Sequence, residues 1–238
     1  MSTLTDFFNL VLVGEAKTYN DHNWYTSGGL KGYIEGRGKT PYPLLTQPLS
    51  NYTLAEIKGF QSRGRDSNGQ LWATGRYQII PNTLKGLQAD LALPDSALYN
   101  QENQDKMGLQ LLLNRSDIKK YIKGEVDDNP ANLEKAALHM AMIWSSIGVP
   151  FDTKGRHGSI RKNQSYYSGG GDRASVDTAL VQDQLKLLRK NFGSGNLTKE
   201  SKQKSSSTEK KRPWIAIVLV ISLGLVSFVT YKLVKTNK

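Results

Sequence analysis

Apolar residues recur every three or four positions through most of the chain after Pro81, which is the spacing of one face of an α-helix. This pattern predicts a series of helices in the segments 83–93, 100–113, 118–122, 130–147 and 176–192. A further helix is predicted at the N-terminus, with Gly14 and Glu15 near its end and an apolar face made by Phe7, Phe8, Leu10, Val11 and Leu12.

The segment between the first helix and Pro81 has a different pattern. Residues 18–52 are rich in Tyr, Gly, Asn and Pro, which favours loops and short strands. Thr53, with Glu56 three residues later, is typical of a capping box at the start of a helix. Residues 71–80 predict a short strand. A helix, a small β-region and then a helical bundle predict an α+β fold with a cleft where the two parts meet.

The composition changes sharply after residue 192. Residues 1–192 are long enough and apolar enough to form a single globular domain with a real core. Residues 193–213 contain Gly, Ser, Lys and Thr with almost no apolar side chains, which predicts a flexible basic tether.

The residues from Trp214 to Val234 form a mostly apolar segment in which Lys232 is the only charged residue. About 20 such residues cross the roughly 30 Å of hydrocarbon in a bilayer, so a transmembrane helix is predicted over 214–234. Trp214 and Tyr231 have the positions of interfacial aromatic residues. Residues 235–238 are then a short basic tail, and the lipid bilayer is a predicted partner.

The net charge of +11 belongs mostly to this C-terminal part, since nine Lys or Arg and only two Glu lie beyond residue 192. The modest basic excess of the globular part fits an anionic polymer or an ordinary basic surface. No nucleic-acid-binding motif is present, so we expect no nucleic-acid partner. Cysteine is absent, which excludes thiolate metal sites, and His22, His139 and His157 lack metal-ligand spacing, so the sequence predicts no metal site.

Glu15 is the first candidate for chemistry. Cleavage of a glycosidic bond needs a proton donor beside the leaving oxygen, and apolar surroundings raise the pKa of a carboxyl toward the value that such a donor needs. Glu15 follows the apolar run Val11-Leu12-Val13 and precedes a polar, aromatic loop. An ordinary solvated glutamate at a helix end is the alternative interpretation.

A second carboxylate, which most glycosidases use, is not selected by the sequence. Asp21, Glu35 and Asp66 are the candidates, and none has a distinctive context. A transglycosylase needs no water-activating base, because the 6-hydroxyl of the sugar itself attacks the anomeric carbon. One carboxyl that acts first as acid and then as base is then sufficient.

Several other residues are candidates for contact with a glycan. Tyr77 and Gln78 follow Gly75-Arg76, and the alternative is a packed Tyr77 beside an exposed Gln78. Trp144 is a candidate floor for a sugar subsite, although a tryptophan on an apolar helix is more often part of the core. Tyr19 and Ser146 complete the predicted substrate-binding set.

Several segments of residues 4–192 together resemble the phage lambda-type endolysins, the lytic transglycosylase branch of the lysozyme-like superfamily. The matching segments occur in the family's order and are the helix that leads to Glu15, the loop 19–29 with Gly28-Gly29, Ala73-Thr74-Gly75-Arg76-Tyr77-Gln78-Ile79, Leu91-Ala92-Leu93, the helix with Gln104-Asp105, and Ile143-Trp144-Ser145-Ser146-Ile147. The family's Ser-Glu-Gly is Gly14-Glu15-Ala16 here, and residues 31–70 are much less alike.

The resemblance implies a lysozyme-like fold with Glu15 as the catalytic acid and base and without a metal or organic cofactor. It predicts a peptidoglycan-degrading enzyme that cleaves the MurNAc-GlcNAc bond and leaves 1,6-anhydro ends. Two alternatives remain open: a hydrolytic lysozyme with a second carboxylate, and an inactive glycan-binding or assembly module. The tether and the membrane anchor are additions to the family's pattern.

The location that follows is a virion membrane or the inner membrane of a phage-infected bacterium, for wall penetration or host lysis. Basic residues flank the apolar segment on both sides, with an excess on its N-terminal side. This excess favours a cytoplasmic globular domain, whereas a wall-cleaving enzyme acts on the opposite side.

Overall fold

The computed structural model describes residues 7–9, 14, 16–38, 40–64, 69–169 and 174–193. The chain divides after Leu197 into two units, and all of these residues belong to the first. Their elements are β1 (His22–Thr26), β2 (Gly29–Tyr33), the 3₁₀ helix η1 (Leu49–Asn51), α2 (Leu54–Gln61), β3 (Leu71–Thr74), α3 (Pro81–Asp90), α4 (Gln101–Leu113), α5 (Ser116–Ile122), α6 (Pro130–Ile143), β4 (Thr153–Lys154), β5 (Ser159–Ile160) and α7 (Thr178–Gly193).

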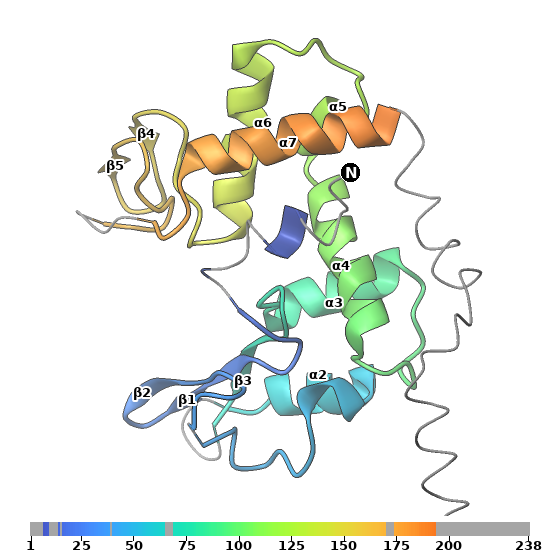
Figure 1. The fold of residues 1–238 in the computed structure, drawn as a ribbon. Coiled ribbons are helices and arrows are strands. Elements are labelled where there is room, and N and C mark those ends of the chain that lie inside the picture. The colour runs from blue at the N-terminus through green and yellow to red at the C-terminus, as the bar shows by residue number, and fades with distance from the viewer. Residues whose placement is uncertain are drawn as a thin grey trace, which may run out of the picture. The chain divides into compact units, whose positions relative to one another are not determined.

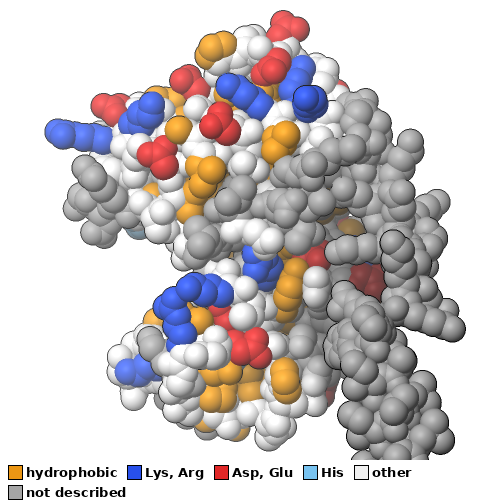
Figure 2. All heavy atoms as spheres, in the orientation of Figure 1, with side chains coloured by type: hydrophobic (Ala, Val, Ile, Leu, Met, Phe, Trp, Pro, Cys, Tyr) orange, Lys and Arg blue, Asp and Glu red, His pale blue; other side chains and the backbone are white. Residues whose placement is uncertain are grey.

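These elements form an α+β fold, as the sequence predicts. The sheet β2-β1-β3 and α2 lie at the bottom of Figure 1, α5, α6 and α7 lie at the top, and α4 runs between the two groups. On the face that Figure 2 shows, the surface is hollowed between the β-region and the upper helical part. This agrees with a cleft between the two parts.

The small sheet is antiparallel and begins with a tight hairpin. His22 pairs with Tyr33 and Thr26 pairs with Gly29, so only two residues connect β1 to β2. The pairing of β1 with β3 is irregular between His22 and Trp24. There the side-chain oxygen of Asn23 accepts a hydrogen bond of 2.9 Å from the backbone N–H of Ala73. This bond replaces the one that the N–H group would make in a regular strand pair.

The helices bury one face each, at the spacing from which they were predicted. On α6 the buried residues are Leu133, Ala136, Ala137, Met140 and Ala141, and on α4 they are Gln104, Met107, Gly108 and Leu112. The capping box is also confirmed: Thr53 accepts from the backbone of Glu56, and the Glu56 carboxylate accepts from the backbone of Thr53.

Two predicted helices are too long. The helix predicted over 83–93 ends at Asp90, because Ala92 has a φ of 49° and Pro94 follows. The helix predicted over 130–147 ends at Ile143, and Trp144 has an extended backbone. The next residues leave the helix because Gly148 and Val149 donate backbone hydrogen bonds to Val176 and Gln164 instead.

The hairpin of β4 and β5 was not predicted, because two-residue strands leave no periodic signal in the sequence. Within the described ranges no helix is long and apolar enough to cross a bilayer. The predicted transmembrane segment 214–234, the tether 193–213 except for Gly193, and the tail 235–238 lie outside the described residues.

Candidate active site

The Gly-Arg-Tyr-Gln segment forms a tight turn directly after β3. Thr74 and Ile79 pair as an antiparallel bridge and close the turn, and the backbone of Gln78 donates to Gly75 O over 3.1 Å. Gly75 and Gln78 both have left-handed backbone conformations, with φ of 70° and 48°. The Gln78 side chain also donates to Gly75 O, over 2.9 Å, and this second hydrogen bond stabilises the turn.

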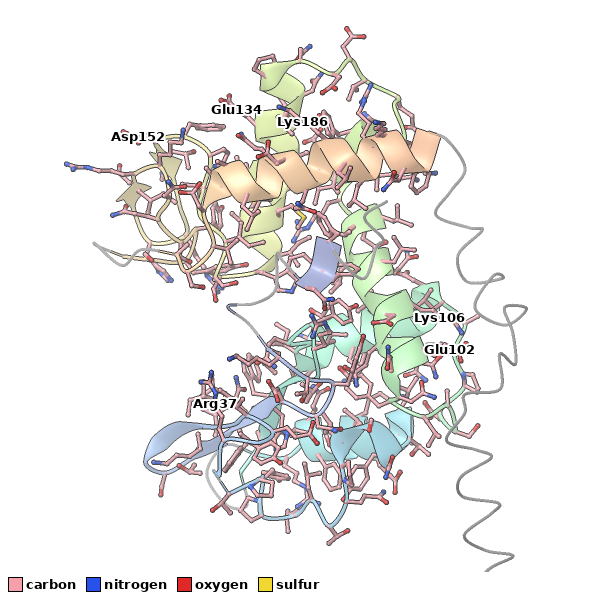
Figure 3. All side chains as sticks on the ribbon, viewed as in Figure 1. Arg37, Glu102, Lys106, Glu134, Asp152 and Lys186 are labelled. Atoms are coloured by element: carbon pink, nitrogen blue, oxygen red, sulfur yellow. The ribbon has the colours of Figure 1, made fainter. Side chains whose placement is uncertain are left out.

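Gln104, on α4, fixes this turn to a second segment of the chain. Its side chain is fully buried, and Oε1 accepts a hydrogen bond of 3.0 Å from the backbone of Arg76. Its Nε2 donates to the backbone oxygens of Tyr19 and Tyr99. Figure 3 labels Glu102 and Lys106, which lie on α4 on either side of Gln104 in the sequence. One buried amide therefore holds the turn 75–78 against the loop that contains Tyr19.

Arg76 connects the segments on either side of position 15. Its guanidinium donates to Lys17 O over 2.8 Å and to the side-chain oxygen of Asn9, and it lies over the ring of Tyr19 at 5.7 Å. The side chain is only 8% exposed. Because hydrogen bonds from a charged group are stronger than neutral ones, Arg76 fixes the spacing between the N-terminal segment and the loop after position 15.

Asp105 accepts hydrogen bonds from two phenols. Tyr19 and Tyr77 donate to the same oxygen, Oδ1, over 2.8 and 2.7 Å. Burial is the main reason that the pKa of both tyrosines lies above the ordinary value. The neighbouring Asp105 carboxylate raises the pKa of both further. Both phenols are therefore protonated near neutral pH and act as donors, which holds the Tyr19 loop against the turn 75–78 from a second direction.

The rings of Tyr77 and Trp144 lie in the core, which corrects the expectation that these side chains contact a sugar. Each is 2% exposed. The indole Nε1 of Trp144 donates to Tyr77 O over 3.1 Å, and Phe8 packs edge-on against both rings. A buried ring cannot stack on a glycan unless the core opens. The buried Tyr77 ring therefore anchors the turn 75–78 in the core, and Trp144 holds it there through the hydrogen bond to Tyr77 O.

Ser146 lies beside the N-terminal segment. A Cβ added at Gly14 would be 2.8 Å from the Cβ of Ser146 and 2.0 Å from the Oγ of Ser175, so Gly14 packs closely against both serines. Ser146 is 9% exposed. Position 14 requires glycine because no larger side chain fits between this segment and the two serines.

Asp21 has a structural role that the sequence did not reveal. Its carboxylate is 2% exposed and accepts hydrogen bonds from the backbones of Lys17, Thr18 and Glu35 and from the Thr18 hydroxyl, at 2.7 to 3.3 Å. With both oxygens engaged in this way, Asp21 has little capacity left to activate a water or to attack a sugar.

Of the four remaining candidate residues, the structure describes two. Tyr19 is half-buried with its hydroxyl on Asp105, and Glu35 is exposed. Glu15 and Asp66 lie outside the described residues. Among the residues that the structure describes, no group of His, Asp and Glu is arranged to hold a metal ion.

Arg76, Gln104 and Asp105 are the residues whose roles sequence reasoning missed. The available signal was weak: Gln104 and Asp105 are polar residues on a helix whose next buried positions, Met107 and Gly108, are apolar. A polar side chain on the buried face of a helix indicates a specific hydrogen-bonding partner inside the protein.

Comparison with known proteins gave no match to a family model, to a curated protein or to a solved structure. The functional argument therefore depends on the residues and geometry of this chain.

Proposed function

We propose that this protein is a membrane-anchored peptidoglycan-cleaving enzyme with a lysozyme-like catalytic domain and Glu15 as its acid and base. The observation that supports this most directly is the set of contacts of Arg76. Its guanidinium bonds to Asn9 and Lys17, one on each side of Glu15 in the sequence, while its backbone is held by Gln104. Direct contacts link the three segments with predicted site residues, 14–19, 75–78 and 144–146. Gln104 and Asp105 on α4 join the first two, and the indole of Trp144 joins the third to Tyr77.

The chemistry proposed for Glu15 is general acid–base catalysis. The protonated carboxyl gives its proton to the glycosidic oxygen as the bond to the anomeric carbon breaks. The resulting carboxylate then takes the proton of the sugar's own 6-hydroxyl as that oxygen bonds to the anomeric carbon, which closes a 1,6-anhydro ring. The enzyme returns to its starting protonation state, and no water is consumed.

The environment of Asp21 favours this reaction over hydrolysis. A hydrolytic enzyme needs a second carboxylate that is free to activate water or to attack the sugar. Asp21 already accepts four hydrogen bonds, and Glu35 is exposed on the β-region. The candidates for the second carboxylate of a hydrolase are therefore Glu35 and Asp66.

The products of peptidoglycan digestion test this proposal. We expect mass spectrometry of the released muropeptides to show mainly 1,6-anhydro ends, which are lighter than reducing ends by one water. Asp66→Asn should keep most of the activity. Reducing ends as the major product, together with loss of activity in Asp66→Asn, would instead favour a hydrolytic lysozyme.

Asp21→Asn is not a clean test of catalysis. The substitution places an amide donor among backbone donors, so it should destabilise the loop 16–21 whatever the reaction. Activity lost in this variant must be compared with its thermal stability before any chemical role is assigned.

The segment 214–234 is proposed as the membrane anchor, with the tether 193–213 before it. The described part of α7 extends to Gly193, and its buried residues Val181, Leu185 and Leu188 all precede the tether. We expect a chain that ends at Gly193 to be soluble and to cleave purified peptidoglycan, while the full chain partitions into membranes. Aggregation of the shorter chain would mean that the apolar segment belongs to the fold.

A tether of about 20 residues has a typical reach of roughly 25 Å as a flexible chain. The proposed anchor would therefore restrict cleavage to glycan strands close to the bilayer of a virion or of the host.

A further inference from the structure

A pocket of about 280 Å³ opens on the β-region beside the hairpin of β1 and β2. Its apolar wall includes Tyr33, Leu45 and Leu49, and its polar lining is made by Asn20, His22, Glu35, Thr46 and Gln47. The volume lies just below the range of about 300–1,000 Å³ for clefts that bind whole small molecules. It is suited to a group of the size of one amino-acid side chain.

Two of the neutral polar residues of this pocket, His22 and Asn20, are already engaged in hydrogen bonds. His22 is 3% exposed, its Nε2 accepts from the backbone of Tyr42 over 3.1 Å, and its Nδ1 is 2.7 Å from Asn20 O. Burial lowers the pKa of His22, so the ring is neutral near pH 7, and these two bonds fix Nδ1 as its protonated nitrogen. The amide of Asn20 accepts from the backbone of Ser50 and donates to Glu35.

Glu35 provides the charge of the pocket. Its Oε1 accepts from Asn20 over 3.0 Å, and its backbone N–H donates to Asp21 over 2.9 Å, so the residue is positioned from two sides. Among the described residues, no ion pair includes Glu35. Arg37 lies two residues later and is labelled in Figure 3, and none of the ion pairs among the described residues joins it to Glu35. The pocket therefore presents one negative acceptor beside an apolar wall.

We propose that this pocket binds the side chain of a diamino acid in the peptide stems of the cell wall, with its terminal ammonium on Glu35. This inference rests on the proposed function. An ammonium supplies the donors and the positive charge that Glu35 lacks, and an ion pair with a positioned carboxylate is stronger than a neutral hydrogen bond. The methylene chain would contact Leu45 and Leu49, and the Tyr33 ring adds a face that attracts cations. An uncharged sugar hydroxyl would satisfy none of these features as fully.

Binding is tested directly, without catalysis, by calorimetric titration of the full chain with Nα-acetyl-lysine amide. The matched probe is Nα-acetyl-norleucine amide, which has the same kind of chain but no ammonium. We expect the lysine probe to bind at least about tenfold more tightly than the norleucine probe, because only the lysine probe forms an ion pair with Glu35. Glu35→Gln keeps the acceptor for Asn20 and removes the charge, so it should abolish this preference.

Glu125→Gln is the control variant, because Glu125 is an exposed residue outside the pocket and its substitution changes the net charge by the same amount. It should bind both probes as the unmodified chain does. Equal affinity for the two probes, or a lysine preference that survives in Glu35→Gln, would overturn the inference.

Wall cleavage then identifies the source of the ammonium. The rate on intact peptidoglycan is divided by the rate on glycan strands from which an amidase has removed the peptides. We expect Glu35→Gln to lower this ratio about tenfold, in proportion to the lost binding preference. An unchanged ratio would mean that the pocket takes free amines and not wall peptides, and would overturn the proposal. If the unmodified chain cleaves neither substrate, the proposed function fails, and calorimetry still reports on the pocket separately.

Discussion

Glu15→Gln is expected to lower the rate of peptidoglycan cleavage by about 10² to 10⁴, the usual contribution of a general acid and base. The amide has nearly the shape of the carboxyl, but it cannot give a proton to the glycosidic oxygen or take one from the 6-hydroxyl. The measurement is the initial rate of muropeptide release from purified peptidoglycan, followed by mass spectrometry so that a change of product is also detected.

The interpretation of this variant depends on a comparison with stability. Glu15→Gln should melt close to the unmodified protein, and Glu125→Gln, which removes a carboxylate from an exposed turn, should keep both its stability and its activity. Activity of Glu15→Gln within a few-fold of the unmodified protein would assign the proton transfer to another residue. A large fall in melting temperature would mean that the loss is structural.

Gly75→Ala is expected to have the largest effect on stability. Gly75 has a φ of 70°, which costs about 1–2 kcal/mol for a residue with a side chain. Its Cβ would lie 2.1 Å from Oε1 of Gln104, the atom that accepts from the backbone of Arg76. Overpacking a core costs about 1–3 kcal/mol, and a buried donor that loses its partner costs a similar amount.

Together these effects predict a loss of roughly 3 kcal/mol or more in the free energy of unfolding. For a domain of this size that corresponds to a fall of about 6–12 °C in melting temperature. Activity should fall as well, since the displaced Gln104 no longer holds Arg76 and Tyr19 in register. Calorimetric melting and the peptidoglycan assay measure the two effects on the same sample.

Gly86→Ala is the matched control. Gly86 is in α3, where an added Cβ meets no atom within 4 Å, so alanine should be neutral or stabilise the helix by up to about 1 kcal/mol. A melting temperature of Gly75→Ala that matches Gly86→Ala would contradict the structure of the turn 75–78.

The hydrophobic pattern was sufficient to predict the order of the main elements, because helices and their caps depend on residues close together in the chain. The period of buried residues on α6, the capping box of Thr53 and Glu56, and the asparagine at position 100 before α4 are all local signals. The boundaries near Trp144 were wrong because a distant partner, Tyr77 O, binds the indole, and the chain beyond it pairs with segments around 164 and 176.

In the candidate site, too, contacts between residues far apart in the chain were not predicted from the sequence. The resemblance to the endolysins singled out the Gly-Arg-Tyr-Gln segment. The strand predicted over 71–80 ends at Thr74, and the chain forms a turn directly after it. Whether Tyr77 faces a cleft or the core was decided by Phe8, Gly108 and Trp144, which are close to it only in the folded chain. The structural role of Asp21 has the same origin, since one of its donors, Glu35, is 14 residues away.

What the sequence alone determined is therefore the class of fold and the order of its main elements, since both follow from local spacing and residue type. The segments on which chemistry is proposed were selected by the resemblance to a family. Only the tertiary structure decided which polar side chains are partners and which aromatic rings are buried. Gln104 and Arg76 illustrate the reason: the amide reaches Tyr19 O across 85 positions of sequence and the guanidinium reaches Asn9 across 67, and no local pattern encodes contacts of that range.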